Sequence, residues 1–157
     1  MTGDEKWCLY ANITRKGSWV QSKIGLRPKK AMLCIWWDSQ GILHMEFLKN
    51  GDIINSEIYC QQLERLNKVI EEKRGKDRKV RFLHDNARPH TAKTTIEKLN
   101  SFKWDILLHP CSPDLAPTDY YLFRSLSNTL QRKTFNSDRE MEEWMKSFFD
   151  EKPAFYL

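Results

Sequence analysis

Residues 31–37 read AMLCIWW, an almost unbroken apolar run. Such a run is typical of a strand that is covered on both faces of a sheet. Residues 38–41, DSQG, carry a turn signal, and residues 42–48 then have the composition of another strand, which predicts a hairpin with a four-residue loop. Upstream, residues 7–13 mix aromatic and β-branched side chains, so we expect a further strand there.

Helical patterns take over after this hairpin. Asn55 and Ser56 can cap a helix, and Gly75 can end it. The remaining expected elements are strands at 80–84 and 104–108, a helix at 91–102 with Ile96 and Leu99 inward, and helices that begin at Pro117 and after Ser137. This order predicts an α/β fold over residues 1–157, in which an antiparallel meander and later αβ crossovers form one mixed sheet flanked by helices.

Composition limits the class of protein further. With 157 residues, 18.8 kDa and 40% hydrophobic residues, the chain has the size of one domain. The mean hydropathy is −0.67, no apolar run approaches the ~18 residues that span a bilayer, and the first residues are polar, so we expect neither a membrane protein nor a signal peptide. The four cysteines lack CxxC spacing, which argues against a zinc site and favours reduced thiols in a cytosolic or nuclear protein.

The net charge of +5 is unevenly distributed. Residues 15–30 carry six basic and no acidic side chains, and residues 65–93 carry ten basic and four acidic ones. Such clustering indicates a surface that binds a polyanion, most simply DNA, although charge runs are also common on solvated faces. The candidate DNA contacts are Lys29, Lys30, Lys73, Arg74, Lys76, Arg78, Lys79 and Arg88.

Three carboxylates lie at element boundaries. Asp4 is near the start of the first strand, Asp85 directly follows the strand at 80–84, and Asp119 is in the first turn of a helix. If they converge, their oxygens suit Mg²⁺ or Mn²⁺, and two such ions can assist phosphodiester cleavage. The alternatives are a frayed terminus for Asp4, a turn for Asp85 and a helix-dipole contact for Asp119.

Several blocks of the sequence resemble the signatures of mariner-family transposases. The blocks are TGDEKW at 2–7, IWWD at 35–38, YCQQL at 59–63, HDNARPHTA at 84–92 and SPDLAPTDYYLF at 112–123, and the resemblance covers nearly the whole chain. It implies a ribonuclease-H-like fold of the retroviral-integrase class. It also implies that Asp4, Asp85 and Asp119 match the three catalytic, metal-binding aspartates of the family, with a two-metal site for Mg²⁺ or Mn²⁺.

The resemblance implies a function as well. Family members cut DNA at the terminal inverted repeats of a transposon and join the freed 3′ ends to a target TA dinucleotide, so the expected partner is DNA, with a homodimer in the full-length family and a nuclear location. His84, Asn86 and His90 would lie around the metal-binding aspartates or contact DNA, together with Arg88. Alternatively, they simply order their loop.

The sequence also departs from the family pattern. Asp85 and Asp119 are separated by 33 residues, one fewer than is typical, with the shortening near residues 110–112, and the segment at 19–28 is shorter too. We expect the paired helix-turn-helix domains that recognise transposon ends to be absent upstream of Asp4. The alternative function is therefore a truncated or domesticated remnant that binds DNA weakly or is inert.

Overall fold

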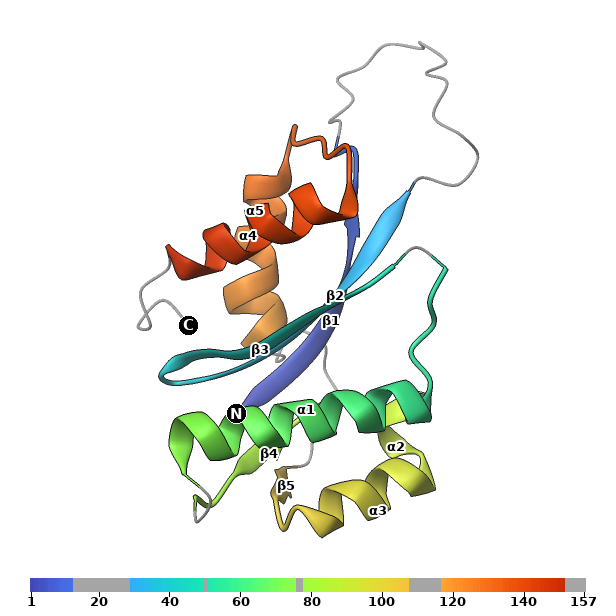
Figure 1. Cartoon of the computed structure of the whole chain (residues 1–157), viewed down its shortest axis with the longest axis vertical. Coiled ribbons are helices and arrows are strands. Elements are labelled where there is room, and N and C mark those ends of the chain that lie inside the picture. Colours follow the sequence, from blue (N-terminus) through green and yellow to red (C-terminus); the bar gives the residue numbers. More distant parts are fainter. Residues whose placement is uncertain (13–28, 50, 76–77, 108–116, 152–157) are drawn as a thin grey trace.

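A five-stranded mixed sheet forms the centre of the molecule (Figure 1). The computed structural model describes residues 1–12, 29–49, 51–75, 78–107 and 117–151. The strands lie in the order β3-β2-β1-β4-β5; β1 to β3 are antiparallel, and β4 and β5 run parallel to β1, which confirms the predicted meander and crossovers. Their bounds are Thr2–Leu9 (β1), Lys30–Asp38 (β2), Gly41–Leu48 (β3), Arg81–Leu83 (β4) and Asp105–Leu107 (β5).

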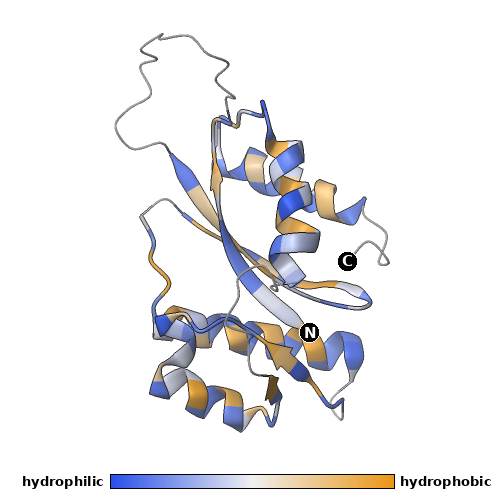
Figure 2. Ribbon diagram, turned by 180° about the vertical axis from the view of Figure 1, so that it is seen from behind, coloured by the Kyte–Doolittle hydropathy of each residue, from blue (hydrophilic) through white to orange (hydrophobic). Residues whose placement is uncertain are grey.

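Helices cover both faces of this sheet (Figure 1). On one face lie α1, α2 and α3, and on the other lie the π-helical segment η2 and helices α4 and α5; viewed from behind, both groups mix apolar and hydrophilic residues (Figure 2). In the described part of the chain, no helix is long and apolar enough to cross a membrane. The bounds are Ser56–Arg74 (α1), Arg88–Thr91 (α2), Lys93–Ser101 (α3), Thr118–Phe123 (η2), Arg124–Leu130 (α4) and Asp138–Asp150 (α5).

Strand β2 separates two hydrophobic clusters. Leu33 and Ile35 pack with η2, α4 and α5, whereas Cys34 and Trp36 pack with α1 and α3. All four side chains are at most 1% exposed, because successive side chains of a strand point to opposite faces and both faces are covered. The prediction of a strand buried on both sides is therefore confirmed.

The junction between β1 and β4 is narrow. The only register pair between these strands is Thr2 with Leu83, and the backbone N–H of Leu83 donates to the Met1 carbonyl at 3.0 Å. By contrast, β1 pairs with β2 over all eight of its residues. The described part of the sheet thus consists of a three-stranded and a two-stranded portion that meet over a short contact.

The helix signals of the sequence are largely confirmed. Asn55 Oδ1 accepts a hydrogen bond from the Ile58 N–H at 2.8 Å and so caps α1, which ends at Gly75. Ser137 caps α5 in the same way by accepting from the Glu140 N–H at 3.2 Å. Each cap satisfies an N–H group that the first helical turn leaves unpaired.

Three boundaries differ from the expectations. Strand β1 begins at Thr2 rather than at residue 7, because its backbone pairs with β2 although its first residues are polar, and Ile13 lies outside the described residues. The β2–β3 loop has two residues rather than four, since Asp38 still pairs with Gly41. The helix expected at 91–102 is interrupted at the extended Ala92, so that Thr91 ends α2 and α3 begins at Lys93, and Ile96 is 48% exposed instead of inward.

Candidate active site

The three candidate carboxylates come from β1, from the loop after β4 and from η2. Because Thr2 is opposite Leu83 in the parallel β1–β4 pair, Asp4 and Asp85 both lie two residues beyond this pair in the same direction. Asp119 is in the first turn of η2, which packs against β1. The fold therefore brings the three carboxylates to the same region, and their joint role as a site stays a prediction.

The electrostatics of Asp4 reflect this convergence. Burial, together with the negative charges of Asp119, Glu5 and Asp85, raises the pKa of the Asp4 carboxyl to about 7. The structure accordingly places an energetic cost on the ionised form of Asp4, and a cation bound nearby would remove that cost.

The chemistry of these donors fits a hard divalent cation. Asp4, Asp85 and Asp119 offer carboxylate oxygens, which are the ligands that Mg²⁺ and Mn²⁺ prefer. Within the described residues, however, no three acidic, histidine or cysteine side chains approach closely enough to form a ready-made metal site. The carboxylates are neighbours, and their metal-binding role stays a prediction.

The loop after β4 fixes one oxygen of Asp85. Its Oδ1 accepts hydrogen bonds from the Ala87 N–H at 2.9 Å and from His90 Nδ1 at 2.5 Å. The bond from His90 is the main cause that lowers the pKa of Asp85 to about 2, despite partial burial. In the part of the chain that the structure describes, the other oxygen, Oδ2, has no hydrogen-bond partner, so it remains available to a ligand.

His90 ties this loop to β1. It is only 3% exposed, its Nε2 lies 3.3 Å from Glu5 Oε1, and its ring packs on Tyr59 with 4.0 Å between the centroids. Burial would lower the pKa of His90, but the bonds to Asp85 and Glu5 outweigh it and raise the pKa to about 9. At neutral pH the ring is therefore protonated and donates from both nitrogens.

We predict that His90→Phe, which keeps a ring against Tyr59 but removes both donors, destabilises the protein by about 3 kcal/mol, because Glu5 is left buried without its partner. Since the folded pKa of His90 lies above its ordinary value of 6.5, this stabilisation is complete below about pH 6.5 and is lost as the pH rises through about 9.

Urea unfolding of the wild type and His90→Phe at several pH values measures the difference. The exposed neighbour Thr91, changed to Ala, is the matched control, and it should leave stability nearly unchanged. A stability difference that stays constant from pH 6 to pH 10 would contradict the bridging role of His90.

The other two polar residues expected around the aspartates differ in environment. The His84 ring stacks on Phe82, with 5.1 Å between the centroids and 8° between the planes, and also faces Tyr59. Asn86 is exposed. His90 is thus hydrogen-bonded to the candidate metal ligand Asp85, and a contact of His84, Asn86 or His90 with DNA stays a prediction.

Sequence reasoning missed two members of the site. Glu5 follows Asp4 in β1 and accepts from His90, and Tyr59 supplies the ring that covers His90. No signal in the sequence pointed to Glu5, because the strand was expected to begin at residue 7 and the pairing of β1 on both sides is known only from the structure. Tyr59 follows the apolar spacing of α1, so the sequence predicted only a core residue.

Asp119 stands on a well-anchored segment. Thr118, which precedes it, is 1% exposed and accepts a hydrogen bond from Trp37 Nε1 at 3.1 Å. Leu122 and Phe123 at the other end of η2 are buried in the core. Asp119 itself is exposed, on the side that faces away from this core. Residues 108–116, which lead to η2, lie outside the described residues. They include residues 110–112, where the sequence is shorter than the family pattern.

The candidate DNA contacts have different surroundings. Lys29 forms an ion pair with Asp138 at 3.2 Å, and the Lys30 ammonium lies 3.8 Å from the centre of the Trp7 ring. Both remain on the surface, so a DNA contact by either stays a prediction. Among the remaining candidates, Lys73, Arg78, Lys79 and Arg88 are exposed, and Lys76 lies outside the described residues.

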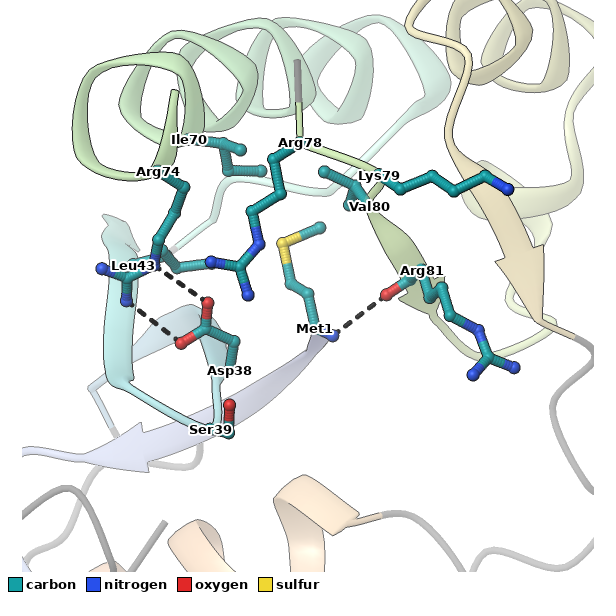
Figure 3. Close-up of a pocket in the computed structure, with 10 residues that line it drawn as sticks. All are labelled: Met1, Asp38, Ser39, Leu43, Ile70, Arg74, Arg78, Lys79, Val80 and Arg81. Carbon is teal, nitrogen blue, oxygen red and sulfur yellow. Dashed lines mark hydrogen bonds and ion pairs between the residues drawn. The ribbon is translucent and has the colours of Figure 1, made fainter. Parts of the chain in front are cut away.

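A cavity of about 290 Å³ lies between the end of α1, the β2–β3 turn and the start of β4 (Figure 3). Arg74 crosses its wall and binds both oxygens of Asp38, at 3.2 and 3.1 Å, so its charge is already paired. The Arg78 guanidinium points into the cavity, whereas Lys79 points away from it (Figure 3). This basic cavity is at the opposite end of β4 from Asp85, and is therefore separate from the carboxylates.

Comparison with known proteins identifies the family. A family model described as "Transposase (partial DDE domain)" matches residues 9–80. The crystal structure of the catalytic domain of the Mos1 mariner transposase is similar to this chain, with 38% sequence identity and a TM-score of 0.85. The match covers 99% of this chain and 71% of the chain in that crystal structure. The chain belongs to the mariner family of transposases. The ribonuclease-H-like fold that the resemblance implied is thereby confirmed.

Further relatives agree with this mariner assignment. The Mariner Mos1 transposase of Drosophila mauritiana is 40% identical over 97% of this chain, and the histone-lysine N-methyltransferase SETMAR of Homo sapiens is 39% identical over 96% of it. The Mos1 mariner paired end complex with Mn matches with a TM-score of 0.91 and 39% identity, over 99% of this chain and 49% of that one. The chain spans 48% of the length of the Mos1 transposase and 24% of that of SETMAR.

Proposed function

We propose that this mariner chain is a catalytic domain that cuts and joins DNA strands with divalent metal ions held by Asp4, Asp85 and Asp119. The observation that carries the proposal is the fold itself, because the parallel pairing of β1 with β4 and the packing of η2 against β1 bring three carboxylates from separate elements to one region. The family relationship supports the same reading, since Mos1 structures have been solved with Mn and with Mg.

The chain's own residues would position the reaction. Asp4 is fixed by the pairing of β1 with β2, Asp119 by the anchored η2, and Asp85 by the bonds from Ala87 and His90 that leave Oδ2 available. When bound, two Mg²⁺ or Mn²⁺ ions would neutralise charge at the phosphate and assist in-line attack. Water would attack first and a DNA 3′-hydroxyl second, so the protein would contribute orientation and electrostatic stabilisation.

The partners follow from the same proposal. Mos1 is solved as a paired-end complex with its left transposon end and as a strand transfer complex. For this chain we assign residues 1–157 to one catalytic domain, DNA with transposon ends and a TA target as the substrate, and the nucleus as the location; the homodimer belongs to the full-length family. The exposed basic residues Arg78, Lys79 and Arg88 are the candidates for contacts with DNA phosphates.

The metal requirement tests the function directly. Supercoiled plasmid is incubated with the protein in Mn²⁺, in Mg²⁺, or in EDTA, and we expect nicked circles in the two metals and none in EDTA. A thermal melt gives an independent readout, since an ion that binds the folded state should raise Tm by several degrees. Absence of both nicking and a metal-dependent Tm shift would favour the inert remnant over the enzyme.

A further inference from the structure

Two large aromatic side chains are exposed directly beside Asp119. Tyr120 and Tyr121 are 59% and 54% exposed, whereas Thr118 and Leu122 on either side are 1% exposed. Tyrosines that serve only the fold bury most of their surface. In the described part of the chain, neither hydroxyl has a hydrogen-bond partner, so the core does not account for these two residues.

The backbone beneath the two rings is held firmly. Both ends of η2 are anchored, by the bond between Thr118 and Trp37 and by the burial of Leu122. Three consecutive residues, Asp119 to Tyr121, are therefore exposed on a segment whose two ends are fixed. The platform is preorganised, and binding to it would require little ordering of the chain.

The rings are arranged so that one supports the other. The Tyr120 and Tyr121 centroids are 5.1 Å apart with an interplanar angle of 86°, and Tyr121 in turn meets Trp37 edge-on at 6.4 Å. Tyr121 thus packs against Trp37 at the buried end of β2, and the Tyr120 ring packs perpendicular to the Tyr121 ring. This leaves aromatic surface open to solvent on the two residues that follow Asp119.

A cation accompanies this aromatic surface. The Arg124 guanidinium carbon lies 5.7 Å from the centre of the Tyr120 ring, and within the described residues Arg124 forms no ion pair. An aromatic face stacks on a nucleobase, and a guanidinium binds a phosphate, so the pair matches the two halves of a nucleotide. The combination of rings and charge fits a nucleic acid better than an apolar protein surface.

We propose that the Tyr120 ring, supported edge-on by Tyr121, stacks on an unpaired nucleobase of the DNA near the phosphate that is cut, with Arg124 on an adjacent phosphate. This inference rests on the proposed function and adds a base-binding site to it. Tyr120 directly follows Asp119 in the first turn of η2, so a base held there would belong to a nucleotide in the region of the carboxylates. Stacking accepts any base, so the site selects an unpaired strand rather than a sequence.

The test compares two DNA probes in Ca²⁺ and without Mg²⁺ or Mn²⁺, so that binding is measured apart from cleavage. One probe is a blunt duplex, and the other carries a short 3′ single-stranded end with 2-aminopurine at the unpaired position. We expect the wild type to bind the second probe about tenfold more tightly and to quench its fluorescence. Tyr120→Ala should lose both effects, and Tyr120→Phe should keep them, because it retains the ring.

Ile96→Ala is the matched control, since Ile96 is similarly exposed but lies on α3, in the other helical layer. An unchanged preference in Tyr120→Ala would overturn the inference. A weaker self-association in sedimentation, with no change in quenching, would also overturn it and would assign the rings to a contact between copies.

The inference and the proposed function can fail separately. A wild type that nicks plasmid in Mn²⁺ but shows no preference for the unpaired end would retain the function and overturn the base-binding site. A wild type that quenches the unpaired base but never nicks would support the base-binding site and contradict the catalytic role.

Discussion

Asp85→Asn is expected to reduce metal-dependent nicking of supercoiled DNA by about a thousandfold or more, while leaving the fold intact. The reason lies in the two oxygens of Asp85. An asparagine retains an acceptor at Oδ1, so the bonds from Ala87 and His90 can persist. Its amide nitrogen would replace the available Oδ2, and an amide NH₂ group neither binds a cation nor carries the negative charge that a divalent ion requires.

The rate of conversion from supercoiled to nicked circles in Mn²⁺ measures this effect, and circular dichroism checks the fold. Asp105→Asn is the control, because Asp105 is an exposed carboxylate on β5 with only a loose ion pair to Arg81 at 3.6 Å. Its nicking rate should match that of the wild type. Equal rates for Asp85→Asn and the wild type would refute the catalytic assignment of Asp85.

The second large effect is expected from Gly3→Ala. A Cβ at Gly3 would lie 2.2 Å from Trp36 Cδ1 and 2.5 Å from Trp36 Nε1, well inside van der Waals contact. Trp36 is 1% exposed and stacks on His44, so it has no free space into which to move. We expect a loss of about 3 kcal/mol and a fall in Tm of about 10 °C.

A double-mutant cycle isolates the cause of this destabilisation. In a Trp36→Phe background the ring next to Gly3 is smaller, so Gly3→Ala should cost less than it does in the wild type. Chemical denaturation of the four proteins gives the coupling free energy. If Gly3→Ala costs the same in both backgrounds, the clash with Trp36 is not the reason that this position is glycine.

The sequence predicted the parts of the fold that are marked by a local pattern, such as a continuous apolar run or a pair of helix caps. Residues 31–37 are apolar at every position and form a strand covered on both faces, and α1 begins and ends at the cap residues Asn55 and Gly75. The start of β1 was missed because its pairing partner, and not its own composition, makes it a strand. The inward position of Ile96 was predicted wrongly because Thr95, a polar residue whose hydroxyl donates to the Pro89 carbonyl at 2.7 Å, takes the buried place.

The candidate site shows the same division. Asp4, Asp85 and Asp119 could be found because each marks an element boundary and lies in a block that resembles the mariner signatures. The bridge from Glu5 through His90 could not be found, because it joins residues of β1 and α2 that only the parallel pairing of β1 and β4 brings together. The paired state of Arg74 likewise depends on Asp38, which is distant in sequence.

The narrow junction between β1 and β4 has a consequence for how the carboxylates work together. Asp4 belongs to the three-stranded portion of the sheet and Asp85 follows the two-stranded one, and few hydrogen bonds fix the angle between the two portions. The contacts of His90 with Glu5 and Asp85 therefore hold the two portions of the sheet together. A cation shared by Asp4 and Asp85 would also connect the two portions of the sheet. Binding of the ion would therefore restrict the motion of one portion relative to the other.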